Sequence, residues 1–265
     1  MPTAFITGGS SGIGFAASWE LALKGYNLAL FARDASKLLS ARDALLEAAP
    51  NIEVEVFAVD VANRDAFVGA LRAAVDNLGP PDMAIASAGI AEPGLFREQN
   101  FEQHQRHMDV NYFGTLTFIE TLRGPMTTAG GGRFGLIASG AAFFGIYGYG
   151  AYAPSKFALR GLAEILHLEL ESANISVTLI YPPDTDTPQL KAEKRTKPSA
   201  TQEISEGGGL WQPEDVAARL IKGMEAGRPV VTPGLQMLLL NGLSSLMSPI
   251  LRWHQRRIIR KHEAK

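Results

Sequence analysis

The chain alternates short, strongly apolar runs with longer amphipathic stretches, and this alternation constrains its fold more than any other feature. The runs that predict strands are Ala4–Thr7, Leu28–Ala32, Val54–Val59, Met83–Ser87, Arg133–Ala138, Ser176–Tyr181 and Pro229–Thr232. The stretches that predict helices are Gly14–Leu23, Ala35–Ala49, Arg64–Leu78, Phe101–Thr121, Ser155–Ser172 and Pro213–Ala226. Continuously apolar strands separated by helices indicate a parallel sheet that is covered on both faces. We therefore predict a single α/β domain with a doubly wound, mostly parallel sheet of seven strands.

Composition excludes several classes of protein. The 265 residues contain no cysteine, so disulfides and thiolate metal sites are impossible, and we expect no metal. The formal net charge of -2 argues against a general nucleic-acid binder. The charge is uneven, because six Lys or Arg and one acid follow from Arg252 onward. That asymmetry marks the C-terminal end as a candidate contact surface.

A glycine-rich turn directly follows the first predicted strand and precedes an amphipathic helix. It reads Thr-Gly-Gly-Ser-Ser-Gly-Ile-Gly over residues 7–14. Glycines allow the backbone to turn tightly near a pyrophosphate, and the helix directs its free N–H groups at that anion. A plain turn is the alternative reading, but the position of the segment favours a Rossmann-type nucleotide site. The candidate residues are Gly8, Ser10, Ser11, Gly12, Ile13 and Gly14.

The residues after the second and third strands bear on the choice of cofactor. An acid after the second strand usually binds the ribose of NAD, whereas here Ala32 is followed by Arg33, with Lys37 one helical turn later. Two cations suit the 2′-phosphate of NADPH; a pair of solvated charges is the alternative. Asp60 is either a turn residue or a contact to the adenine amino group. Further along, Ala88 and Gly89 let the chain pass beside a bound cofactor.

Four polar residues suggest the chemistry. Tyr152 and Lys156 are four residues apart, on one face of a predicted helix. A nearby ammonium and an oxidised nicotinamide would lower the pKa of Tyr152, which could then exchange a proton with a carbonyl oxygen. Ser139 could hold that carbonyl, or serve only as a turn serine. Asn111 falls inside a predicted helix, where it is either an ordinary polar residue or the site of a kink that frees a carbonyl for a proton relay.

Taken together and in this order, these motifs resemble the short-chain dehydrogenase/reductase family over nearly the whole chain. The resemblance implies that Tyr152 is the acid–base, that Lys156 binds the ribose and lowers the pKa of the tyrosine, that Ser139 positions the carbonyl, and that Asn111 supports the relay. Homodimers or homotetramers are the family's usual assemblies. The resemblance adds to the expected cofactor contacts Val61, Pro182, Thr185 and Thr187.

The string Pro-Pro-Asp-Thr-Asp-Thr-Pro over residues 182–188 is more specific than the family motifs. It resembles the branch of the family that reduces 3-ketosphinganine with NADPH in sphingolipid synthesis. The alternatives are reduction of another hydrophobic ketone, such as a 3-oxoacyl chain or a steroid, and a nucleotide-binding protein without catalysis. All four catalytic residue types are present, and this argues against the last reading.

The expected organisation is a reductase domain over residues 1–233, with an irregular lid at 182–209, and an amphipathic basic segment over 234–265. Asn241, Gly242, several serines and Pro249 interrupt the apolar part of that segment, so no membrane span is predicted. Apolar residues beside a basic cluster suit a helix lying on an anionic membrane, whereas packing at a subunit interface is an equal alternative. With no signal peptide recognised, we expect a cytoplasmic protein that can bind the membrane surface peripherally.

Overall fold

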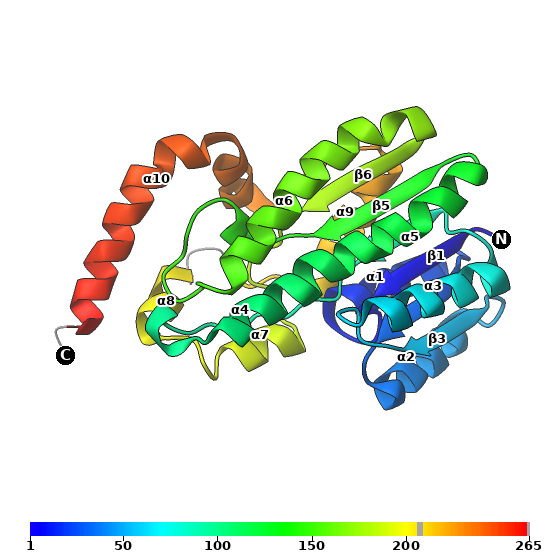
Figure 1. Ribbon diagram of the computed structural model, residues 1–265, viewed down its shortest axis with the longest axis horizontal. Coiled ribbons are helices and arrows are strands. Elements are labelled where there is room, and N and C mark those ends of the chain that lie inside the picture. Colours follow the sequence, from blue (N-terminus) through cyan, green and yellow to red (C-terminus); the bar gives the residue numbers. More distant parts are fainter. Residues whose placement is uncertain (206–208, 264–265) are drawn as a thin grey trace.

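The computed structural model describes residues 1–205 and 209–263, and a seven-stranded sheet forms its centre (Figure 1). The strands are β1 (Thr3–Thr7), β2 (Asn27–Ala32), β3 (Val54–Ala58), β4 (Met83–Ala86), β5 (Gly132–Ile137), β6 (Ile175–Ile180) and β7 (Val230–Val231). Their order is β3-β2-β1-β4-β5-β6-β7, and every neighbouring pair is parallel. The predicted fold is confirmed, and each strand begins and ends within one residue of the expected position.

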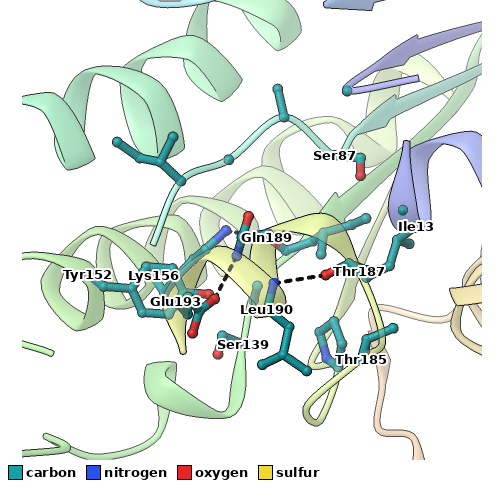
Figure 2. Close-up of a pocket in the computed structure, with 18 of the residues that line it drawn as sticks. Ile13, Ser87, Ser139, Tyr152, Lys156, Thr185, Thr187, Gln189, Leu190 and Glu193 are labelled. Atoms are coloured by element: carbon teal, nitrogen blue, oxygen red, sulfur yellow. Dashed lines mark hydrogen bonds between the residues drawn. The ribbon is translucent and has the colours of Figure 1, made fainter. Parts of the chain in front are cut away.

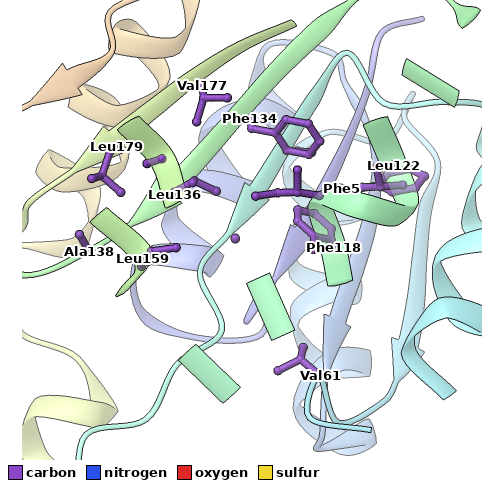
Figure 3. Close-up of a cluster of buried hydrophobic side chains, with 14 of the residues drawn as sticks. Phe5, Val61, Phe118, Leu122, Phe134, Leu136, Ala138, Leu159, Val177 and Leu179 are labelled. Carbon is purple, nitrogen blue, oxygen red and sulfur yellow. The ribbon is translucent and has the colours of Figure 1, made fainter. Parts of the chain in front are cut away.

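Helices cover both faces of the sheet, which explains why the central strands are continuously apolar. On one face, α1 (Gly12–Leu23), α2 (Ala35–Ala48) and α9 (Pro213–Glu225) share one hydrophobic core. On the other, α3 (Arg64–Leu78), α5 (Gly114–Thr128) and α6 (Tyr152–Glu169) share a second. Phe5, Phe118 and Phe134 lie at the centre of that second core (Figure 3). A strand such as β1, in which all five residues are buried, cannot alternate polar with apolar residues.

The predicted helix Phe101–Thr121 is wrong as a single element. It divides into α4 (Phe101–Met108) and α5, with a π-helical turn over Asp109–Phe113 between them. Such turns are inserted into α-helices mostly at functional sites. Gly114 follows the turn directly, and a Cβ there would lie 2.9 Å from the Val61 side chain. The turn therefore brings the helix close to the loop after β3.

The stretch expected to be an irregular lid is partly helical. It contains α7 (Pro188–Glu193) and α8 (Ser199–Ser205), while its residues 206–208 lie outside the described part of the chain. Thr187 caps α7 by accepting a hydrogen bond from the backbone of Leu190. Pro188 occupies the first turn, where its missing N–H costs nothing. Short 3-10 turns occur at Phe96–Glu98, Gly140–Ala142 and Glu171–Ala173.

The C-terminal segment forms one long helix, α10 (Gly234–Glu263); residues 264–265 are not described. Asn241, Gly242 and Pro249, which were expected to interrupt its apolar part, all lie within this continuous helix. By length and composition, α10 is the one helix in the described residues that could cross a membrane, and only 17% of its most apolar window is buried. It lies at the end of the molecule far from the N-terminus, beside α8 (Figure 1).

Candidate active site

A cavity of about 390 Å³ opens at the carboxyl ends of the central strands. Open parallel sheets bind ligands at this edge, beside the point where the strand order reverses, which here lies between β1 and β4. Predicted cofactor residues that line it are Gly8, Ser10, Ser11, Gly12, Ile13, Arg33, Lys37, Asp60, Val61, Ala88, Gly89, Pro182, Thr185 and Thr187. Ser139, Tyr152 and Lys156 line it too, whereas Gly14 and Asn111 do not but lie next to its lining residues Gly8 and Gly89. One cavity therefore joins both groups of predicted residues.

The glycine-rich turn has a shape that only glycine permits at several positions. Gly8 and Gly12 have φ angles of +67° and +54°. A Cβ on Gly8 would lie 3.0 Å from the backbone nitrogen of Ala88, and one on Gly14 would overlap the carbonyl oxygen of Gly8. The turn thus packs directly against the start of α1 and leaves that N-terminus facing the cavity. This cradle fits a pyrophosphate.

Thr7 joins the two loops at the edge of the sheet, a role that the sequence analysis missed. Its hydroxyl oxygen accepts hydrogen bonds of 3.0 Å from the backbone nitrogens of both Ser87 and Ala88. The loop after β4 is therefore held against the glycine-rich turn. The sequence feature that could have indicated this role is the threonine immediately before the first glycine of the motif.

Arg33 and Lys37 are exposed on one rim of the cavity, as predicted, and Asp34 lies between them. The sequence analysis overlooked this acid. Its carboxylate caps α2 by accepting hydrogen bonds from Ser36 and from the backbone of Lys37, and these bonds lower its pKa. It also lies 3.6 Å from the Lys37 ammonium. Asp34 is therefore engaged with its own helix, which leaves the Arg33 guanidinium for a ligand.

Asp60 acts as a turn residue at the cavity, and its contact to adenine stays a prediction. It lines the cavity, and its carboxylate accepts a 3.0 Å hydrogen bond from the backbone of Ala62, as a turn residue does. Val61 follows it and is buried against Gly114. The loop after β3 is thus fixed from both sides.

Tyr152 begins α6, and Lys156 follows one turn later on the same face, as predicted. Both side chains are buried, and the Lys156 ammonium lies 5.8 Å from the centre of the Tyr152 ring. Pro154 falls in the first turn of the helix, where it is tolerated. Ser139 caps the 3-10 turn after β5 by accepting a hydrogen bond from the backbone of Ala141. Ser139 therefore acts as a turn serine, as one reading predicted, and also lines the cavity.

Of the two readings left open for Asn111, the structure shows the kink, as the π-helical turn, while the proton relay stays a prediction. Its side chain exchanges two hydrogen bonds with the backbone of Ile90, of 2.8 and 3.0 Å, and donates a third of 2.9 Å to the Ser155 hydroxyl. The backbone carbonyl of Asn111 accepts a hydrogen bond from the Thr115 hydroxyl. Asn111 therefore ties the loop after β4 to the helix that carries Tyr152.

The protein's own groups raise the pKa of Tyr152, and the lowering expected with an oxidised nicotinamide beside it stays a prediction. Burial is the main cause and the nearby charge of Glu193 adds to it, while a hydrogen bond with Ser139 acts in the opposite direction. Burial also lowers the pKa of Lys156 to about 8, against an opposing effect of Glu193. Desolvation outweighs the attraction between partners here, because both side chains are buried.

Three residues at the cavity were missed by the sequence analysis: Tyr149, Gln189 and Glu193. Glu193 is buried, and its two oxygens accept hydrogen bonds from the Gln189 amide (3.1 Å) and the Tyr149 hydroxyl (3.0 Å). Figure 2 shows Glu193 and Gln189 projecting from α7 toward Tyr152 and Lys156. A contact between the lid helix and the turn before α6 depends on tertiary packing, and no local pattern signals it.

The far end of the cavity is apolar. Its lining there combines the loop after β5, the lid and α10, and consists of Phe144, Ile146, Leu190, Ile204, Met237 and Leu240. A polar reactive end beside an apolar end suits a substrate that carries a hydrocarbon chain next to its reacting group.

Comparison with known proteins places this geometry in a family. The family model described as short chain dehydrogenase matches residues 2–198. An L-sorbose reductase from Gluconobacter frateurii, solved with NADPH and L-sorbose, superposes with a TM-score of 0.79 at 25% identity, covering 88% of this chain and 96% of its own. The chain belongs to the short-chain dehydrogenase family, whose members use a nicotinamide cofactor.

Within that family, several relatives are named 3-dehydrosphinganine reductase. The one from Danio rerio is 40% identical over 248 residues, which cover 92% of this chain and 75% of the relative. One from Arabidopsis thaliana is 36% identical over 249 residues, covering 93% and 75%. The predicted resemblance to this branch of the family is confirmed, and the chain is an oxidoreductase of that type.

Proposed function

We propose that the protein reduces 3-ketosphinganine to sphinganine with NADPH. The observation that carries the proposal is the cavity itself, which joins a pyrophosphate cradle, the Ser139–Tyr152–Lys156 group and an apolar end. The names of its relatives in animals and plants point to the same substrate. A ketone with a long alkyl chain would place its carbonyl at the polar end and its chain against Met237 and Leu240.

The cradle fits the cofactor by its chemistry. The N-terminus of α1 and the turn around Gly12 would hold the pyrophosphate, and Lys156 the nicotinamide ribose. The Arg33 guanidinium would bind the 2′-phosphate with paired hydrogen bonds, which NADH cannot offer. Asp60 would contact the adenine. When bound, NADPH supplies the hydride that reduces the carbonyl carbon.

The protein's residues supply the proton and the orientation. Ser139 and Tyr152 would both donate hydrogen bonds to the carbonyl oxygen, which fixes the ketone for attack. As negative charge develops on that oxygen, Tyr152 gives up its proton. The raised pKa of Tyr152 keeps this proton in place until the charge appears. Asn111 holds the backbone around Ile90 and Ser155, and we propose that the kink at Asn111 supports the reprotonation of the tyrosine.

We also propose that α10 rests on the cytoplasmic face of a membrane. One stripe of the helix exposes large apolar side chains at three- and four-residue spacing: Leu235, Leu239, Leu243, Leu246, Ile250 and Trp253. A run of cations, Arg252, Arg256, Arg257 and Arg260, continues the helix. The opposite face of α10 packs against the rest of the protein, where it buries Met237, Leu240, Gln255 and Ile258. A helix with one face on the protein and an apolar, basic face outside suits anionic lipid in the plane of the surface.

The deciding experiment follows NADPH oxidation with 3-ketosphinganine in mixed micelles, beside the same assay with NADH. The expected result is substrate-dependent turnover that prefers NADPH. Turnover with equal preference would remove the assigned role of Arg33. A protein that binds NADPH but leaves 3-ketosphinganine unreduced would disprove the sphingoid substrate, and a panel of 3-oxoacyl and steroid ketones would then identify the hydrophobic ketone it reduces.

A further inference from the structure

One buried carboxylate lies beside the reactive groups, and the mechanism above gives it no task. Glu193 is the last residue of α7, is only 7% exposed, and lines the same cavity as Ser139 and Tyr152. Burying a carboxylate away from water is costly unless partners compensate for its charge. The groups around Glu193 therefore indicate what the site is built to receive.

The partners of Glu193 leave its charge only partly compensated. Two of them, the Gln189 amide and the Tyr149 hydroxyl, are neutral donors. The nearest cation is the Lys197 ammonium, at 3.9 Å, and this ammonium also donates to the Ser205 hydroxyl. A carboxylate can accept about four hydrogen bonds. Glu193 therefore retains capacity for one more donor, and a cation would suit it best.

Both neutral partners of Glu193 reach the reactive groups. The ring of Tyr149 lies 5.4 Å from the ring of Tyr152. The Gln189 side-chain oxygen and the Lys156 ammonium lie 3.9 and 3.7 Å from the point where a Cβ on Gly89 would be. Glu193 is thus held within one small group of side chains around Tyr152, as Figure 2 shows. A ketone bound to Tyr152 would bring the carbon next to its carbonyl close to this carboxylate.

We propose that Glu193 binds an ammonium group carried on the carbon next to the reacting carbonyl, and so selects 2-ammonium ketones over neutral or N-acylated ones. The inference rests on the proposed function and names the feature of 3-ketosphinganine that is recognised. An ammonium would complete the hydrogen bonds of the carboxylate and offset its charge. A neutral ketone would leave that charge beside Tyr152, and an N-acyl group would present a bulky amide with a single N–H.

The test compares kcat/KM for 3-ketosphinganine with that for the same ketone lacking the amine, 1-hydroxyoctadecan-3-one, in identical micelles. Wild type should prefer the amine by about 10- to 100-fold, the range of a charge-assisted hydrogen bond. Glu193→Gln, which can still accept a hydrogen bond from Tyr149, should abolish most of that preference through KM. Its affinity for NADPH should stay unchanged. Asp184→Asn is the matched control, because Asp184 is another lid carboxylate that lines the cavity and is not one of the expected cofactor contacts.

Each outcome decides a separate question. Wild type that reduces both ketones equally well keeps the proposed function and overturns the role of Glu193, and this comparison requires no variant to fold. Equal losses for both ketones in Glu193→Gln would show a merely structural role. If Asp184→Asn lost the preference and Glu193→Gln kept it, the ammonium would bind Asp184, and the proposal for Glu193 would be wrong. Wild type that reduces neither ketone would instead disprove the proposed function.

Discussion

The Lys156 ammonium donates a 2.9 Å hydrogen bond to the carbonyl oxygen of Ile137, the last residue of β5. Ser139 follows two residues later, so this bond ties the helix that carries Tyr152 to the strand that presents Ser139. The bond requires Lys156 to lie buried, and burial lowers its pKa to about 8.

Binding of NADPH should therefore weaken as the pH rises through about 8, because only the charged ammonium attracts the anionic cofactor. Fluorescence titration of NADPH between pH 6 and 10 checks this, and Lys156→Arg, which stays charged throughout, should flatten the dependence. If the affinity of the wild type for NADPH did not change between pH 6 and 10, Lys156 would not be the group that attracts the cofactor.

The unfolded chain keeps the proton of Lys156 up to a pH of about 10.4. Unfolding thus takes up a proton between these values, and the contribution of Lys156 to stability should rise with pH in that window.

Replacing Tyr152 with Phe should lower kcat by about 10²- to 10⁴-fold, the usual contribution of general acid catalysis. The ring and its packing against Tyr149 are retained, so NADPH affinity and thermal stability should change little. Initial rates and a cofactor titration measure the two effects separately. Unchanged turnover would remove Tyr152 from the chemistry and favour a nucleotide-binding protein without catalysis.

Replacing Gly14 with Ala should destabilise the protein by about 1–3 kcal/mol, because the new methyl group would overlap the Gly8 carbonyl. NADPH affinity should fall with it, since the cradle must open. Gly161→Ala is the matched control, because nothing lies within 4 Å of its Cβ position in α6. That variant should gain about 0.5–1 kcal/mol. Thermal melts of both variants measure these changes in stability. Equal changes in the two would contradict the close packing of Gly14 against Gly8.

Replacing Arg33 with Ala should weaken NADPH binding by about 10- to 100-fold, the value of a lost charge-assisted contact. The affinity for NADH should change much less. Arg42→Ala serves as the control, since Arg42 is an exposed cation of α2 paired with Asp43. If the Arg33→Ala variant lost affinity for NADPH and NADH equally, the Arg33 guanidinium would not bind the 2′-phosphate.

Replacing Leu246 with Glu should release the protein from anionic vesicles, because this side chain is 77% exposed at the middle of the apolar stripe of α10. Leu168→Glu alters an equally exposed leucine on α6 and should have no effect on binding. Co-sedimentation with phosphatidylglycerol vesicles measures the difference. If Leu246→Glu instead converts a dimer or tetramer into monomers by gel filtration, the stripe is a subunit interface.

The alternation of strands and helices was sufficient to predict the sheet, since buried parallel strands have little choice of composition. The positions of Tyr152, Lys156 and the glycine-rich turn followed from local spacing alone. The π-helical turn at Asn111 was predicted only as a kink, because no residue pattern distinguishes it from a polar helical position. The sequence analysis did not predict that α10 continues through Pro249; this proline is exposed, and water can serve the carbonyl that it leaves unpaired. Glu193 was missed because its significance arises only when α7 packs against Tyr149, in the turn before α6.

Two faces of α10 serve different surroundings: Met237 and Leu240 line the cavity, while Leu239 and Leu243 on the same turns point outward. If the outward face rests on lipid, substrate would pass from bilayer to cavity along a single helix without crossing water. The quantity that saturates such an enzyme is the mole fraction of substrate in the surface, not its bulk concentration. Adding inert lipid at constant total substrate should then slow the reaction, as if a competitive inhibitor had been added.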